Sequence, residues 1–125
     1  MSDIRSHKEL DVWKLAFKLA ADCYAATRVF PSEEVFGQTS QIRRAAVSIA
    51  ANIAEGYGRE STGAFIQFLR VAQGSQKELE THIMLCESVG LLEHSASAPL
   101  LCDTESVGRM LRNLIRSLEA RKSSV

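Results

Sequence analysis

Residues that interrupt helices are scarce in this chain, which has two prolines and seven glycines in 125 residues. Good helix formers such as alanine, leucine, glutamate and arginine are abundant instead, and this favours helix along most of the length. No segment alternates apolar and polar residues as a half-buried strand does. The composition therefore predicts an all-α protein.

The chain also lacks an excess of one charge and a long apolar run. Fifteen Lys and Arg balance fifteen Asp and Glu, so any nucleic-acid interface must depend on how the charges are distributed. No apolar run approaches the roughly 20 residues that span a membrane. The polar N-terminus, MSDIRSHKELD, lacks the features of a signal peptide. We therefore expect a cytoplasmic protein with no membrane association.

Side chains for metal binding or catalysis are few and scattered. They are His7, His82, His94, Cys23, Cys86 and Cys102. None has a partner at ligand spacing, and an odd number of cysteines without paired spacing favours free thiols in a reducing compartment. A nucleophile elbow and a phosphate-binding glycine loop are also missing. We expect no metal, no cofactor, no small-molecule substrate and no enzymatic activity.

Four segments have the apolar spacing of amphipathic helices. They cover residues 8–29, 38–57, 61 or 62 to about 89, and about 100 or 103 to 121. Pro31 ends the first, and the sequence HSASAP, residues 94–99, is expected to be a loop. Short connections between four helices predict an antiparallel up-down-up-down bundle over residues 8–121. Residues 1–7 and 122–125 are expected to be flexible ends.

Apolar residues occupy two adjacent rows of the first predicted helix. A stripe at three-four spacing consists of Leu10, Trp13, Phe17, Ala20 and Tyr24, and it is widened by Val12, Leu15, Ala16, Leu19 and Cys23. We take the first row as the centre of the buried face.

The second predicted helix ends in SIAANIAEGYGR, a run of small residues that carries an amide and a carboxylate. Opposite its apolar stripe lies a polar row of Gln41, Arg44, Ser48, Asn52, Glu55 and Arg59. Alanines between the two rows allow another backbone to approach on both sides. Gly56 and Gly58 are expected to close the helix in the left-handed conformation.

The third predicted helix repeats this arrangement, with Gln73, Gln76 and Glu80 beside its apolar stripe. Gly74 lies in its middle, where glycine costs about 1 kcal/mol relative to alanine, and this indicates a closely packed neighbour. Two interpretations of Asn52 and Glu55 remain: they cap the following turn, or they join a partly buried hydrogen-bond set with Arg44 or a neighbouring subunit. The candidate oligomer interface or structural polar network is Gln41, Arg44, Ser48, Asn52, Glu55, Gln73 and Gln76.

Three stretches, HKELDVWKLAFKLAADCY, FPSEEVFGQTSQIRRAAVSIAANIAEGYGR and FIQFLRVAQGSQKELETHI, together resemble a bacterial four-helix-bundle family. Its founding members are encoded in intervening sequences of 23S rRNA genes. The most specific part is SQIRRAAVSIAANIAEG, and the family motif maps onto Gln41, Arg43, Arg44, Asn52, Glu55 and Gly56.

This resemblance implies an antiparallel four-helix subunit and ring-like homo-oligomers, with a pentamer as the expected form. The chain is also similar to the accessory protein of diversity-generating retroelements, which partners a reverse transcriptase and binds nucleic acid. The family has no established catalytic residues.

Arginines gather on one face of the last predicted helix at positions 109, 112 and 116. With Arg43 and Arg44, we take Arg109, Arg112 and Arg116 as the candidate nucleic-acid-binding residues. The alternative is a solvated face that Glu105 and Glu119 partly neutralise. The functional hypothesis is a non-enzymatic oligomeric protein that acts as an RNA-associated adaptor. The alternative hypothesis is a structural module that binds another protein through the surface of a homo-oligomeric ring.

Overall fold

The computed structural model describes residues 6–123 and consists of helices joined by short turns. The four long helices are α1 (Asp11–Thr27), α2 (Gln38–Tyr57), α3 (Thr62–Ser88) and α4 (His94–Ser123), with short 3₁₀ helices η1 (His7–Glu9) and η2 (Ser32–Glu34). No strand occurs in the described residues, so the all-α prediction is confirmed. Of the ends expected to be flexible, residues 1–5 and 124–125 lie outside the described range.

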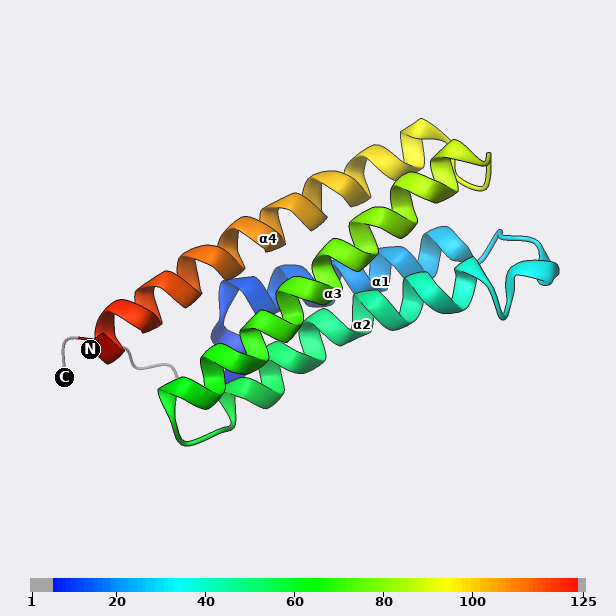
Figure 1. Ribbon diagram of the computed structural model, residues 1–125. Helices are drawn as coiled ribbons and strands as arrows, with labels where there is room; N and C mark the ends of the chain where they lie inside the picture. Colours follow the sequence, from blue (N-terminus) through cyan, green and yellow to red (C-terminus); the bar gives the residue numbers. More distant parts are fainter. Residues whose placement is uncertain (1–5, 124–125) are drawn as a thin grey trace.

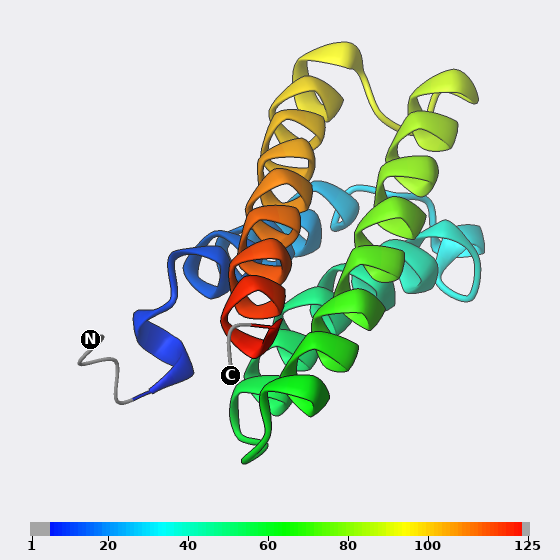
Figure 2. The same cartoon turned by 60° about the vertical axis from the view of Figure 1, so that its left-hand side comes forward.

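The helices form an antiparallel four-helix bundle, as predicted (Figure 1). Each helix packs against the next along the chain, α4 returns to pack against α1, and within residues 6–123 the Cα atoms of diagonal helices stay more than 8 Å apart. The α1–α2 and α3–α4 connections lie at one end of the bundle, and the α2–α3 connection lies at the other (Figures 1 and 2). The face formed by α1 and α2 is therefore opposite the face formed by α3 and α4.

The core is built from the apolar stripes of all four helices. Its largest fully buried side chains are Leu19, Ile42, Ile49, Ile53, Leu69, Leu79, Ile83, Val107 and Leu111. In α1 the buried row is Val12, Ala16, Leu19 and Cys23, whereas Phe17 is 58% exposed and Tyr24 is 40% exposed. The choice of Phe17 and Tyr24 as part of the central buried stripe was wrong. Both rows of α1 are apolar, so spacing alone does not select the row that faces the core, and the aromatic row is left outside.

The prediction that residues 94–99 form a loop was also wrong, because α4 begins at His94 and contains Pro99. The carbonyl of Glu93 accepts hydrogen bonds from the backbone N–H groups of Ala96 and Ser97, each at 3.0 Å. The buried hydroxyl of Ser97 donates to Glu87 at the end of α3. Pro99 is exposed, so the carbonyl left without an N–H partner one turn earlier lies at the helix surface.

The glycines of α2 do not act as predicted, because Gly90, with φ of 83°, is the only described residue with positive φ. Gly56 is buried, and a Cβ added there would lie 2.5 Å from the Cβ of Phe68. Gly56 therefore allows α2 and α3 to cross closely. At Gly74 an added Cβ would meet nothing within 4 Å, so the close neighbour expected there is not found within the described chain.

Candidate functional site

An apolar groove runs between α1 and α2 on the outside of the bundle. It has a volume of about 400 Å³. Its walls include Trp13, Phe17 and Tyr24 of α1, and its floor includes Ala50, Ala51 and Ala54 of α2. The small residues of α2 thus have two effects: they let α2 pack closely in the core, and they leave this groove open beside the aromatic row of α1.

The groove continues into a hollow of about 510 Å³ that Arg43 and Arg44 flank, and Tyr24 and Val47 line both. Arg43 donates from Nε to Thr27 Oγ1 at 2.9 Å, and its guanidinium lies 4.5 Å from the centre of the Tyr24 ring. Arg44 donates to Gln41 Oε1 at 2.7 Å. Neither arginine forms an ion pair with a carboxylate of residues 6–123. This end of the groove is therefore cationic.

Asn52, the amide in the run of small residues of α2, forms hydrogen bonds within its own chain. Asn52 donates from Nδ2 to the Ser48 carbonyl at 2.8 Å and to Ser48 Oγ at 3.0 Å. Ser48 in turn is 2.8 Å from Ser75 Oγ of α3. Glu55 forms an exposed ion pair with Arg59 at 3.3 Å. Hydrogen bonds among the half-buried side chains of Asn52, Ser48 and Ser75 thus join α2 to α3, while the Glu55 carboxylate is exposed to solvent.

Gln76 lies inside the bundle, where it is 3% exposed. It donates from Nε2 to the Thr104 carbonyl of α4 at 3.0 Å. An added Cβ at Gly108 would lie 2.9 Å from Gln76 Cδ, so the absence of a side chain at Gly108 makes room for the amide. Gln76 thus belongs to a polar contact between α3 and α4, while Gln73, one turn earlier, is half-buried.

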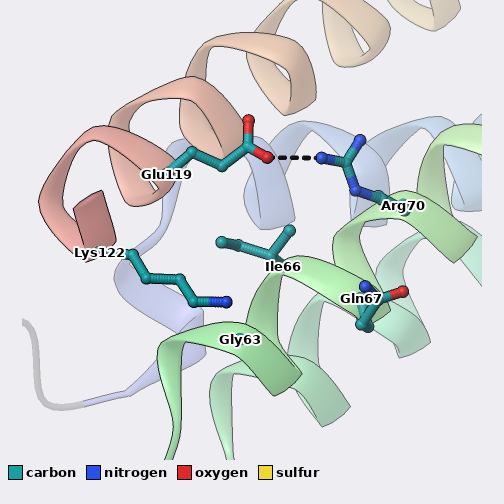
Figure 3. Close-up of a pocket in the computed structure, with 6 residues that line it drawn as sticks. All are labelled: Gly63, Ile66, Gln67, Arg70, Glu119 and Lys122. Carbon is teal, nitrogen blue, oxygen red and sulfur yellow. Dashed lines mark hydrogen bonds and ion pairs between the residues drawn. The ribbon is translucent and has the colours of Figure 1, made fainter.

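The opposite face, between α3 and α4, carries a cationic groove with two hollows. One, of about 420 Å³, is lined by Gly63, Ile66, Gln67, Arg70, Glu119 and Lys122 (Figure 3). The other, of about 260 Å³, is lined by Gln76, Lys77, Glu80, Glu105, Gly108, Arg109 and Arg112. Because the helices are antiparallel, both hollows follow the same edge of the bundle.

Ion pairs neutralise only part of this groove. Arg70 donates to Glu119 Oε2 at 2.7 Å, across the hollow in Figure 3, and Lys77 lies 3.3 Å from Glu80 Oε1. Arg109 donates to the hydroxyl of Ser106 at 3.3 Å. Within the described part of the chain, none of Arg109, Arg112, Arg116 and Lys122 forms an ion pair with a carboxylate. Glu105, which lines the same hollow as Arg109 and Arg112, is also without an ion pair among the described residues, so the excess of positive charge in the groove is modest.

The structure divides the predicted nucleic-acid-binding residues between two faces. Arg109, Arg112 and Arg116 are exposed on α4, with the first two lining the α3–α4 groove, whereas Arg43 and Arg44 lie on the α1–α2 face. The five predicted arginines therefore do not form one surface within a single chain. Sequence reasoning missed Arg70 and Lys77, because the register of α3 against α4 that places them beside the α4 row is not readable from helical spacing. It also assigned Lys122 to a flexible end, whereas α4 extends to Ser123 and includes it.

Few titratable groups are perturbed. Burial raises the pKa of Cys23 to about 12 and that of Cys86 to about 11. Hydrogen bonds from Ser97 and His94 lower the pKa of Glu87. Among residues 6–123, no three His, Cys, Asp or Glu side chains are grouped to hold a metal ion. Over the same range, no helix has the combined length and apolar character of a membrane span.

Comparisons with known proteins give one family and a similar fold. The family model described as 23S rRNA-intervening sequence protein matches residues 8–113. A crystal structure of a protein with unknown function from the S23 ribosomal protein family of Bacteroides thetaiotaomicron superposes with a TM-score of 0.75 at 22% identity, over 83% of this chain and 97% of that one. At that identity the likeness concerns the fold. The comparison with curated proteins gives no match.

Proposed function

Since the chain belongs to the 23S rRNA-intervening sequence protein family, we propose that it is a non-enzymatic, homo-oligomeric adaptor that associates with RNA in the cytoplasm. The observation that carries the proposal is the separation of two unlike surfaces on opposite faces of the bundle. The α1–α2 face is apolar, and the α3–α4 face presents unpaired arginines. One face can be covered by another copy while the other stays open to RNA.

The apolar face supports self-association. A contiguous apolar groove beside exposed aromatic residues is typical of a protein interaction site, and Phe17 and Tyr24 supply large contact area there. The sequence resemblance implies a ring, with five copies as the expected number. In such a ring each α3–α4 groove is repeated once per subunit, so a modest charge excess in one chain adds to a larger field.

The cationic face supports contact with phosphates. Arg109, Arg112 and Arg116 follow one another at three- and four-residue steps along α4, which gives a linear ridge of guanidinium groups. Each phosphate that they neutralise releases condensed counterions, so affinity should fall steeply with salt. No aromatic residue lines either hollow of this groove, so we expect binding that is insensitive to sequence.

The test is the affinity for a generic structured RNA across a salt series. Replacement of Arg109, Arg112 and Arg116 by Gln should reduce the slope by about 2 log units of affinity per decade of salt, at roughly 0.7–0.9 per lost phosphate contact. The control replaces exposed Lys8 and Lys14, which line neither hollow of the groove, and should leave the slope unchanged. Arg43→Gln with Arg44→Gln tests the other arginine pair. Equal slopes for wild type and the triple variant would mean that the α4 row is a solvated face, and no binding at low salt would refute the RNA function.

A second candidate function is favoured by the apolar groove itself. In this alternative the protein is a structural module whose oligomeric surface holds another protein, and the resemblance to the retroelement accessory protein makes a reverse transcriptase one such partner. A pull-down from the native host with nuclease-treated and untreated arms distinguishes the two. Partners that are lost on nuclease treatment support the RNA adaptor, whereas partners that persist support the protein module.

A further inference from the structure

The turn between α1 and α2, residues 28–37, presents apolar side chains to solvent at one end of the bundle. We call it the apex. Phe36 is 93% exposed, Val29 84% and Val35 52%. Scattered exposed hydrophobic residues are common, but three in one short turn, including an almost fully exposed phenylalanine, give this end of the bundle an apolar tip.

The apex is held in a fixed shape by local hydrogen bonds. The backbone N–H of Gln38 donates to Glu34 Oε1 at 3.0 Å, and that of Gly37 donates to the Glu34 carbonyl at 2.9 Å. Phe30, by contrast, is buried in the core. A tip that is already ordered loses little conformational entropy when it binds, which favours its use as an anchor.

The α1–α2 groove matches this tip in chemistry. At about 400 Å³ it lies in the range of small binding pockets, roughly 300–1,000 Å³, and its lining is almost wholly apolar. No residue of the apex lines the groove or its extension in the same chain. The groove therefore remains unfilled by its own turn.

Charge complements the apolar match. Exposed Glu33 stands next to the apolar tip, and it has no ion-pair partner among the described residues. The groove ends between Arg43 and Arg44, whose guanidinium groups contact only neutral partners. The apex thus has a carboxylate beside an aromatic side chain, and the apolar groove ends in two cations. The two surfaces are therefore complementary in charge.

We propose that the occupant of the groove is the apex of a second copy: Phe36 and Val35 insert among the aromatic residues of α1, and Glu33 faces Arg44. The inference rests on the homo-oligomer of the proposed function and names the segment that fills its apolar face. Apex and groove are different surfaces, so the contact is heterologous, and it closes into a ring when the rotation between copies allows.

The first test is a charge reversal followed by sedimentation equilibrium. Glu33→Arg and Arg44→Glu should each raise the dissociation constant by about tenfold or more, because each places like charges together. The double variant should recover most of the wild-type affinity, since it restores an opposite pair at every contact. Absence of recovery would overturn the proposed pairing.

The second test concerns the anchor. Phe36→Ser should weaken association by roughly tenfold to thirtyfold, as expected for a buried aromatic anchor. The matched control is Val71→Ser on α3, which is 54% exposed and lies outside both the apex and the groove. Both side chains are exposed, so thermal unfolding of the monomer should be unchanged. An oligomer that survives Phe36→Ser, or that dissociates equally with Val71→Ser, would overturn the apex proposal while the homo-oligomer stands. A wild-type monomer at micromolar concentration would instead remove the homo-oligomer itself.

Discussion

Replacement of Gly56 by alanine tests the close crossing of α2 and α3. The added Cβ would lie 2.5 Å from Phe68 Cβ, 3.1 Å from Phe65 Cδ1 and 3.3 Å from the Phe65 carbonyl oxygen. Two of these three atoms cannot move away by side-chain rotation, because one is a backbone oxygen and the other is the first side-chain atom of Phe68. The two helices must therefore separate.

Two opposing effects set the magnitude. Overpacking of a core costs typically 1–3 kcal/mol, whereas alanine in place of glycine favours a helix by about 1 kcal/mol. Because the clash involves fixed atoms, we expect a net loss of about 1–2 kcal/mol in the free energy of unfolding. For a domain of this size that corresponds to a fall in Tm of roughly 4–8 °C.

Urea and thermal denaturation followed by circular dichroism measure this loss. The matched control is Gly58→Ala, two residues further along, where φ is −74° and the nearest atom to an added Cβ is 3.5 Å away. That variant should be neutral or slightly more stable, by up to about 1 kcal/mol. If Gly56→Ala stabilised the protein as much as Gly58→Ala, the close crossing of α2 and α3 would be refuted.

Three further predictions concern other parts of the bundle. Gly74→Ala should raise the free energy of unfolding by about 1 kcal/mol in urea denaturation, because an added Cβ meets nothing within 4 Å; a loss would mean that another chain packs on this part of α3. Glu87→Gln should lower stability at neutral pH, because Ser97 and His94 hold the pKa of Glu87 below its ordinary value. The difference from wild type should vanish as the pH falls through that lowered pKa, and a difference independent of pH would contradict the reasoning. Native protein should expose one fast-reacting thiol, Cys102, to a thiol reagent at neutral pH, because Cys23 and Cys86 are buried with pKa values of about 12 and 11; three fast thiols before denaturation would show that the core is open.

The apolar spacing and the residues that end helices were sufficient to predict four helices. They did not predict the buried face of every helix. The bounds of α2 follow from its apolar period, and they agree with the structure. In α1 two neighbouring rows are apolar, so the buried row is decided by packing against α2 and α4 rather than by period. The first turn of α4 has the composition of a loop, and it is helical because Ser97 bonds to Glu87 across the connection.

The candidate surfaces depend on information that a single sequence does not carry. The α4 arginine row is visible at helical spacing, but Arg70 and Lys77 of α3 become its neighbours only through the register of two antiparallel helices. Gln76 and Gly108 are another case, because the fit of an amide against a glycine is a contact between residues far apart in the chain. The family was correctly identified from the SQIRRAAVSIAANIAEG block and its flanks, while self-association and RNA binding remain proposals.

In the proposed function, one face of the bundle is covered by copies of the chain while the opposite face binds RNA. Sedimentation velocity of a fluorescent structured RNA mixed with the protein at low salt tests both parts together. We expect the RNA to sediment with a species whose protein mass is a multiple of 13.8 kDa. Raising the salt should release the RNA before the protein dissociates, because the association face is mainly apolar and the RNA face is ionic. RNA that sediments alone beside a 13.8 kDa monomer would mean that the chain neither self-associates nor binds RNA.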